Sequence, residues 1–414
     1  MSVLPHDRLL SRLERLRQIG RDPQGGITRP FGSVAELEAR AWFGEEVRQA
    51  GLTLHGDAAG NLWARYPGRT AGVLACGSHL DTVPHGGAYD GALGVLMALE
   101  AVQTLKESGY QPEHTLAVLV LTGEEPNAFR LSTLGSRLLT GVLRLDDLAT
   151  ATDGQGRLVA DALREAGANA DPEDLLEASG LCGFLEPHIE QGPRLQDQGD
   201  PLGVVSRITG IVRHAIVLEG EQNHAGTTPW AVRRDSVQAF AGAMALFQEW
   251  LGSYPGQLTG TVGFVDVYPN AVNIVPSRVE FIVEWRSPDW ALLESVAEGY
   301  WEAVQAFCRA AGMGARRQVV LHQAPSRMDP GVQALLSQTM AQQGLPAPVL
   351  ASWAGHDAAH LARRVPAGML FIRSNGKSHC PDEACAPADI LTGVRVLTEF
   401  LRQWDAAPVR EVGP

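Results

Sequence analysis

The chain has few of the features that mark several classes of protein. It contains five cysteines, an odd number without a CxxC pair, so we expect reduced thiols, no structural disulfide and a cytoplasmic location. No stretch approaches the length of an apolar transmembrane span. The segment MSVLPHDRLLSRLERLRQIG alternates leucine with charged residues and lacks the apolar core of a signal peptide.

The sequence also has fewer basic than acidic side chains. The sequence has 34 Lys and Arg against 47 Asp and Glu, a formal net charge of -13. Nucleic acids and anionic membranes both favour clustered Lys and Arg, so we expect neither as a partner. The 414 residues, 45% of them hydrophobic, exceed what one core normally holds, and we expect a globular protein of two domains.

The order of the periodic segments predicts an α/β fold. Helical periodicity is present at 6–19, 34–50 and 91–107, and short apolar or β-branched runs are present at 62–66, 73–76 and 115–121. This alternation is typical of a largely parallel sheet covered by helices.

A different pattern fills residues 209–325. It is strand, helix, strand, strand, helix, strand, the βαββαβ order of a ferredoxin-like unit. Helical patterns at 329–343 and 387–404 and a short strand at 368–372 follow it. We therefore expect one domain formed by 1–208 and 326–414, interrupted by a smaller domain at 209–325.

The stretch GSHLDTVPHGGAYDGALGV concentrates metal-ligand chemistry directly after an apolar run. His79 ends that run, and Asp81, two residues on, lies on the same side of an extended chain, so its carboxylate is expected to orient the imidazole. A Gly-Gly pair lets the chain turn and bring Asp90 back toward His79. The alternative for Asp90 is a cap on the helix that follows it.

A second apolar run ends in TGEE, which places Glu124 and Glu125 at the carboxyl end of a strand, where open α/β sheets form their sites. His188 in FLEPHIEQGP and His379 in SNGKSHCPDE lie in polar turns. Each histidine alone is more simply a structural residue. Three His, one Asp and one Glu together suit two divalent cations that share a carboxylate, polarise a carbonyl and lower the pKa of a bound water. The remaining Glu is then the general base.

These motifs, in this order, resemble the hydantoinase/carbamoylase family of amidases, within the superfamily of two-metal aminoacylases and carboxypeptidases. The similarity covers roughly residues 30–405. Besides the stretches already quoted, it includes LGSR, NHAGTTPWAVRRD, PNAVNIVPSRVEFIVEWRSPD and AGHDA.

The resemblance implies a role for each of these residues. One metal has the ligands His79, Asp90 and His188, and the other has Asp90, Glu125 and His379. Asp90 bridges, Glu124 is the general base, and Asp81 orients His79. The metals are two Zn, Mn, Co or Ni ions per subunit. The implied fold is a two-metal aminopeptidase-like catalytic domain with an inserted lid and dimerisation domain, and hence a homodimer.

The resemblance also implies substrate contacts from His224, Asn273, Arg286, Gln191 and the loop at Gly355. The planar fork of Arg286 suits a substrate carboxylate, and the alternative is an ion pair with Glu280 or Glu284. His224 alone is a turn histidine, whereas beside AGTTP it resembles an oxyanion stabiliser.

The expected reaction is cleavage of the ureido or amide C–N bond of an N-carbamoyl-L-amino acid or related ureido acid by a metal-activated hydroxide. Allantoate and β-ureidopropionate are alternative substrates, and a dipeptidase or N-deacylase is an alternative enzyme. A silent carboxylate-binding relative is the alternative outside enzymes. HDAAH at 356–360, with His379, also has the spacing of a zinc-protease helix, but that interpretation leaves His79, Asp90, Glu125 and His188 without a role. The segment PNAFR at 126–130, Trp230 and Trp353 depart from the family pattern and leave the substrate side chain open.

Overall fold

The computed structural model describes residues 5–169 and 175–407, which divide into two compact units. The first unit joins the chain before Arg207 to the chain after Ser326, and the second unit is Arg207–Ser326. The expected boundaries, 209 and 325, lie within two residues of these positions. In the part of the chain that the structure describes, no helix combines the length and the apolar character needed to cross a membrane.

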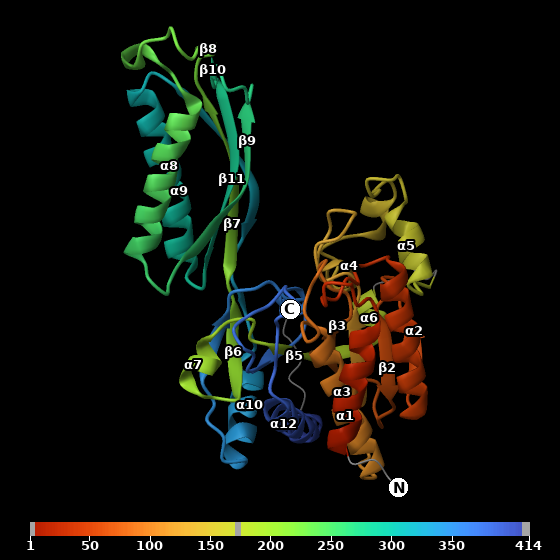
Figure 1. The fold of residues 1–414 in the computed structure, drawn as a ribbon. Coiled ribbons are helices and arrows are strands. Elements are labelled where there is room, and N and C mark those ends of the chain that lie inside the picture. Colours follow the sequence, from red (N-terminus) through yellow and green to blue (C-terminus); the bar gives the residue numbers. More distant parts are fainter. Residues whose placement is uncertain (1–4, 170–174, 408–414) are drawn as a thin grey trace. The chain divides into compact units, whose positions relative to one another are not determined.

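The first unit contains a nine-stranded sheet (Figure 1). Its strands are β1 (Thr53–Gly56), β2 (Leu62–Tyr66), β3 (Val73–His79), β4 (Thr115–Leu121), β5 (Leu181–Ile189), β6 (Leu202–Ile208), β13 (Ser326–Arg327), β14 (Val349–Ser352) and β15 (Ala367–Ile372). The order is β1-β2-β4-β3-β5-β15-β6-β13, and β14 pairs with β6. The central strands β4, β3, β5 and β15 are parallel, so their carboxyl ends lie at one edge of the sheet.

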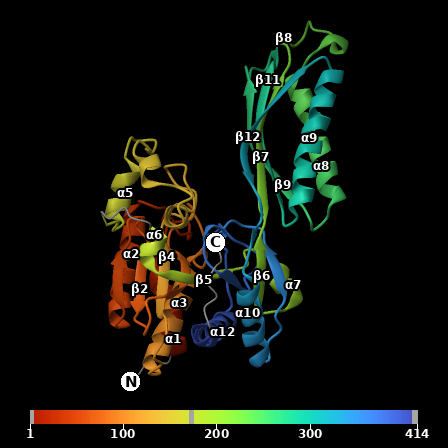
Figure 2. The ribbon, with the colours of Figure 1, turned by 180° about the vertical axis from the view of Figure 1, so that it is seen from behind.

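Helices cover this sheet. The long ones are α1 (Pro5–Gln18), α2 (Val34–Gln49), α3 (Ala92–Glu107), α10 (Pro330–Gln342) and α12 (Pro387–Ala406). The shorter ones are α4 (Leu134–Leu139), η1 (Leu145–Leu148), α5 (Val159–Glu165), α6 (Leu175–Ser179), α7 (Arg194–Gln198) and α11 (Ala358–Leu361). Helix α3 is apolar and buried along almost its whole length, because it packs on β3 and β5 on one side and lies beside α12 on the other (Figure 2).

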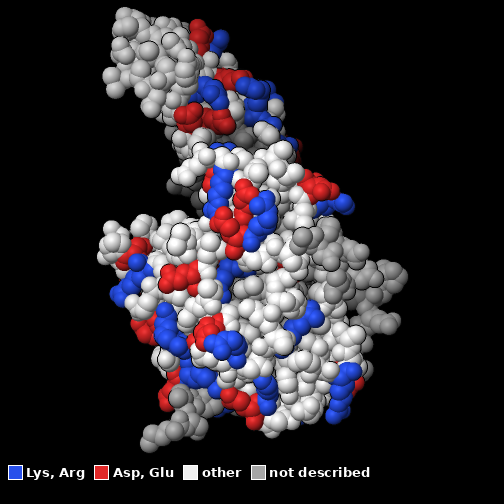
Figure 3. Space-filling view, turned by 90° about the vertical axis from the view of Figure 1, so that its right-hand side faces the viewer, with Lys and Arg blue, Asp and Glu red and all other residues white. Residues whose placement is uncertain are grey.

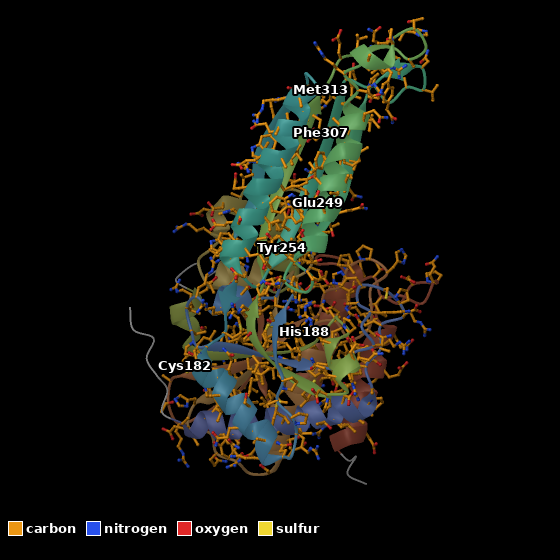
Figure 4. The ribbon with its side chains drawn as sticks, turned by 90° about the vertical axis from the view of Figure 1, so that its left-hand side faces the viewer. Cys182, His188, Glu249, Tyr254, Phe307 and Met313 are labelled. Atoms are coloured by element: carbon orange, nitrogen blue, oxygen red, sulfur yellow. The ribbon has the colours of Figure 1, made fainter. Side chains whose placement is uncertain are left out.

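The second unit is a four-stranded antiparallel sheet with two helices on one face. The sheet order is β12-β7-β11-β9. Its elements are β7 (Gly210–Glu219), β8 (Asn223–His224), η2 (Trp230–Val232), α8 (Ser236–Ser253), β9 (Thr259–Tyr268), β10 (Ile274–Val275), β11 (Arg278–Ser287), α9 (Trp290–Ala310) and β12 (Gly314–Gln323). Strands β7 and β11 alternate buried with partly exposed residues, since their buried side chains face the helices. The helix α8 ends next to Tyr254, and α9 carries Phe307 (Figure 4).

Acidic and basic side chains are mixed on the face of the molecule shown in Figure 3. Blue and red side chains lie among one another there rather than separating into areas of one sign.

Candidate metal centre

The parallel strands of the first unit bring the predicted ligands to one edge of the sheet. His79 is the last residue of β3, His188 is the next to last residue of β5 (Figure 4), and Glu124 and Glu125 follow β4. The fourth parallel strand, β15, leads into the loop that carries His379. The carboxyl ends of parallel strands therefore hold this group of side chains, as in other open α/β sheets.

Asp90 lies at the centre of the group. Its Oδ1 is 3.1 Å from Nε2 of His188 and 3.8 Å from Nε2 of His79. Its Oδ2 is 3.3 Å from Nε2 of His379, and that nitrogen is 3.1 Å from Oε1 of Glu125. The two oxygens of one carboxylate thus face two different sets of donors.

Hydrogen bonds of the two buried imidazoles fix which nitrogen faces Asp90. Nδ1 of His79 is 2.9 Å from the carbonyl oxygen of Asp81, and Nδ1 of His188 is 2.9 Å from the carbonyl oxygen of Ile189. A carbonyl can only accept, so Nδ1 donates in both rings and Nε2 is the nitrogen that faces Asp90. A cation that replaces a proton in this group would therefore bind at Nε2.

The contact between Asp81 and His79 differs from the one expected. The backbone carbonyl of Asp81 accepts the bond from Nδ1, whereas its nearest carboxylate oxygen is 3.6 Å from that nitrogen. The carboxylate instead accepts from the backbone N–H groups of Glu124 at 3.3 Å and Glu125 at 3.0 Å. Asp81 therefore connects the ends of β3 and β4, and its main chain orients the imidazole.

The glycine after Asp90 is required by the packing of His79. Gly91 has φ of +62°, and a Cβ there would lie 2.3 Å from the His79 ring. Gly91 is also the N-cap of α3, which has no side-chain cap bond. The carboxylate of Asp90 accepts instead from Gln191 at 2.8 Å and Ser378 at 2.7 Å, so the capping alternative is wrong.

The electrostatics of the group follow from this arrangement. Burial by itself would raise the pKa of Asp90, but bonds with His188 and His379 outweigh it and hold that pKa well below its usual range. Although burial opposes the charge on His188, Asp90 raises its pKa to about 9. Hydrogen bonds to Asp90 and Glu125 raise the pKa of His379 to about 10. The pocket thus attracts positive charge, which divalent cations would supply in place of these protons.

Glu124 has the opposite character. Burial raises the pKa of its carboxyl well above the usual range, and the nearby carboxylates of Glu125 and Asp357 raise it further. Its Oε2 is 3.8 Å from Nε2 of His79. A buried carboxyl with a raised pKa is a candidate for holding and releasing a proton during a reaction.

The donor sets fit metal binding. In each of two groups, His79, Asp90, His188 and Asp90, Glu125, His379, the possible ligand atoms lie within 4.8 Å of one another. A third such group is Glu186, His188 and His356, but Glu186 accepts from Ser78 at 2.9 Å and from the Ala358 N–H at 2.8 Å. The first two groups are therefore the stronger candidates for metal binding.

The zinc-protease arrangement of HDAAH is not formed within the described residues. Nε2 of His356 is 2.8 Å from the Ser352 hydroxyl, and Nε2 of His360 is 3.0 Å from the Thr133 hydroxyl. Neither histidine shares a candidate metal group with His379.

Comparisons with known proteins agree with this geometry. Residues 75–403 match Peptidase family M20/M25/M40. The chain belongs to this family. Membership in M20/M25/M40 implies divalent metal ions, for which the candidate ligand groups are present.

Curated relatives and solved structures extend the match over nearly the whole chain. An N-carbamoyl-L-amino acid amidohydrolase of Geobacillus stearothermophilus is 36% identical over 406 residues, 95% of this chain and 97% of that protein. An allantoate amidohydrolase of Escherichia coli (strain K12) is 35% identical over 391 residues, 94% of this chain and 95% of that protein. The crystal structure of a hydantoinase/carbamoylase family amidase from Burkholderia multivorans has a TM-score of 0.89 at 30% identity, covering 98% of each chain. The predicted hydantoinase/carbamoylase resemblance is confirmed.

Two of the expected substrate contacts of this M20/M25/M40 protein are in the first unit. The side chain of Gln191 reaches the candidate ligand group, because its amide N–H donates to Asp90. The backbone of Gln191 is in the left-handed region, with φ of +63°. Gly355 lies between β14 and α11, and a Cβ there would meet open space.

The other three expected substrate contacts, His224, Asn273 and Arg286, are in the second unit, at two separate places. The carbonyl of Asn273 accepts from the Ala225 N–H at 3.0 Å, next to His224. Nδ1 of His224 accepts from the N–H groups of Gly226 and Thr227, which leaves the proton on Nε2 as a donor.

Arg286 lies near the other end of β11. Its Nε donates to Oε1 of Glu284 at 2.7 Å, which is the ion pair considered as the alternative from sequence. Arg286 is eight positions along the strand from Arg278, the first residue of β11, which corresponds to roughly 26 Å at about 3.3 Å per residue. His224 and Asn273 lie beyond the Arg278 end, beside β10.

Sequence reasoning missed polar residues around the M20/M25/M40 ligand set. Ser378, which contacts Asp90, directly precedes His379 in a motif that was read only for its histidine. Glu186 has no exposed surface within β5, and its charge contributes to the raised pKa of His188. The position of Glu186 inside an apolar strand could have indicated this role, because a buried carboxylate needs polar or charged partners. His85, for which no role was predicted, pairs with Asp22 at 2.7 Å and is mostly exposed.

Proposed function

We propose that this protein is an amidohydrolase that cleaves the ureido C–N bond of an N-carbamoyl-L-amino acid or a related ureido acid with the help of two divalent cations. The observation that carries the proposal is the position of Asp90 between two donor groups, with the raised-pKa carboxyl of Glu124 beside His79. The names of the relatives, which act on linear C–N bonds, support the substrate class.

His79, Asp90 and His188 would hold one cation, and Asp90, Glu125 and His379 the other. Zn, Mn, Co and Ni all suit His and carboxylate ligands. When bound, the ions supply Lewis acidity to the scissile carbonyl and to the attacking water.

Glu124 moves the proton in this proposal. Its carboxylate takes a proton from the attacking water as the oxygen bonds to the ureido carbon, and it passes that proton to the leaving nitrogen as the C–N bond breaks. With an N-carbamoyl substrate this step gives one amine and a carbamic acid. The carbamic acid then decomposes to carbon dioxide and the second amine, so the final products are the amino acid, carbon dioxide and ammonia.

The remaining contacts would select and orient the substrate. Arg286 offers two parallel N–H donors to a substrate carboxylate, in exchange for its present bond with Glu284. Nε2–H of His224 would donate to the oxygen on which negative charge develops. Asn273, Gln191 and the loop at Gly355 would complete the contacts.

We also propose that the second unit is a ferredoxin-like lid and dimerisation domain. The proposal is supported by the order in which the strands of its four-stranded sheet and its two long helices follow one another, β7, α8, β9, β11, α9 and β12. Both edge strands carry exposed apolar side chains, Phe264 and Val265 on β9 and Val319 and Val320 on β12, and an open edge can pair with that of a second copy. The distance between Arg286 and His224 also favours a homodimer, because one small substrate does not reach both residues of a single lid.

A substrate panel tests the proposal. We expect turnover of N-carbamoyl-L-amino acids, allantoate or β-ureidopropionate, and an increase in KM of roughly tenfold or more in Arg286→Lys, since a bidentate charge-assisted bond is lost. Turnover confined to dipeptides or N-acyl amino acids would instead assign the same centre to a dipeptidase or deacylase. Binding without turnover of any of these compounds would favour a silent carboxylate-binding protein.

A further inference from the structure

Glu383 lies in the loop between β15 and α12, four residues after His379. Its side chain is buried, with 6% of the residue exposed, and both carboxylate oxygens have partners. Oε1 accepts from the backbone N–H of Tyr89 at 2.7 Å and of Asp90 at 3.0 Å. Oε2 accepts from the Ser378 hydroxyl, 3.0 Å away. One side chain therefore joins the segment that carries Asp90 to the segment that carries His379.

Both of these segments lack regular structure where they present their ligands. Asp90 lies between β3 and α3, and His379 between β15 and α12. His379 has φ of +56°, which is unfavourable for a residue with a side chain and needs support from its surroundings. Contacts from outside each loop must therefore set the distance between the two ligands.

Ser378 connects Glu383 directly to the carboxylate that faces both donor groups. Its hydroxyl is 2.7 Å from Oδ2 of Asp90 and 3.0 Å from Oε2 of Glu383. A hydroxyl has one proton, so it donates to one of these oxygens at a time. The backbone and the side chain of Asp90 are thus both held from the His379 loop.

The chain also leaves room for this carboxylate. A Cβ on Gly87 would lie 2.1 Å from the carboxyl carbon of Glu383, so only glycine permits the approach. Placing a second acidic group beside Asp90 is electrostatically unfavourable, and the two backbone N–H bonds to Glu383 offset that cost.

We propose that Glu383 is a positioning residue, whose carboxylate clamps the Asp90 loop to the His379 loop and so fixes Asp90 for both cations. The proposal rests on the two-metal centre of the proposed function. Acceptor geometry rather than charge is what the clamp supplies. In Glu383→Gln the amide oxygen still accepts from Tyr89 and Asp90, and the amide N–H donates to Ser378.

The experiment titrates the full chain, freed of metal by chelation, with Co²⁺ alone and follows binding by calorimetry and by the visible absorption of the bound ion. Glu383→Ala is expected to weaken Co²⁺ binding about 10- to 100-fold, as is usual for residues that hold metal ligands in place, and to change the spectrum. Glu383→Gln is expected to bind within threefold of the parent. Asp382→Ala, the matched control, removes the adjacent exposed carboxylate, which pairs with Lys377 at the surface, and is expected to leave binding unchanged.

Co²⁺ affinity of Glu383→Ala within twofold of the parent, with the parental spectrum, overturns the clamp. Glu383→Gln binding as weakly as Glu383→Ala overturns it too, because charge would then be the cause. If Glu383→Ala does not fold, Gly87→Ala displaces the same carboxylate from the other side, and undiminished affinity in that variant overturns the clamp. A parent that binds two ions but hydrolyses no ureido compound contradicts the proposed function alone, whereas a parent that binds none removes the metal centre and the clamp together.

Discussion

Replacing Glu124 with glutamine separates proton transfer from metal binding. In the proposed ligand sets Glu124 holds no cation, so Glu124→Gln is expected to keep the metal content of the parent. General bases contribute about 10²- to 10⁴-fold to rate, which corresponds to about 3 to 5 kcal/mol of activation free energy. We expect kcat to fall by that factor while KM changes by less than about threefold, because the side chain acts only in the transition state.

Glu124→Gln lowers kcat in this proposal, but it is not expected to lower the unfolding temperature of the metal-free protein. Burial and the neighbouring carboxylates raise the pKa of Glu124, so its ionised form is disfavoured in the folded state. An acid with a raised pKa contributes stability below its unfolded pKa, and that stability is lost as the pH rises through the folded value. At pH 8 in a chelator, Glu124→Gln is therefore expected to unfold at the parental temperature or above it.

The assay combines steady-state kinetics on an N-carbamoyl-L-amino acid, elemental analysis of the purified variant and thermal unfolding in chelator. Glu113→Gln serves as the control and should match the parent in all three, because it alters a half-exposed acidic side chain before β4, at the opposite end of that strand from Glu124. A Glu124→Gln enzyme with kcat within threefold of the parent, at full metal content, would refute the assignment of the general base.

Two further predictions concern charge and assembly. In the metal-free protein, contacts with Asp90 raise the pKa of His188 to about 9 and that of His379 to about 10. The stabilising contribution of these two histidines is therefore complete below about pH 6.5 and is lost as the pH rises through the raised values. The unfolding temperature in chelator should fall between pH 7 and pH 10, and an unfolding temperature that does not change over this range contradicts the prediction. The second prediction is that the second unit of each chain supplies His224 to the active site of its partner in a dimer. Mixing the inactive Glu124→Gln and His224→Ala proteins under conditions of subunit exchange should then restore activity in the mixed dimer. No recovery of activity in a mixed dimer that is shown to form would mean that His224 serves the active site of its own chain.

Much of the fold follows from local patterns in the sequence. The strand expected at 115–121 has those bounds, and the helices expected at 34–50 and 91–107 are observed at Val34–Gln49 and Ala92–Glu107. That the candidate ligand side chains meet could also be predicted from the sequence, because parallel strands bring their carboxyl ends to one edge whatever the details of the loops.

Contacts between residues far apart in the sequence could not be predicted from local sequence patterns. Glu383 and Asp90 are 293 residues apart, and nothing in either segment specifies the other. The carbonyl of Asp81 was missed because every residue has a carbonyl, and only the local turn decides which one accepts. In the segment 126–130, the side-chain oxygen of Asn127 accepts from the Phe129 N–H, and the Phe129 ring lies 5.9 Å from that of Phe31, 98 residues earlier in the sequence.

In the proposed function, hydrolysis depends on two cations held by His79, Asp90, Glu125, His188 and His379. This dependence is measured by adding Zn²⁺, Mn²⁺, Co²⁺ or Ni²⁺ singly to the chelated protein and recording bound metal and turnover of N-carbamoyl amino acids and allantoate together. We expect no turnover in the chelated protein and an increase in turnover that reaches its plateau at two bound ions per chain. Full turnover in protein shown to be free of metal would mean that hydrolysis does not need these cations.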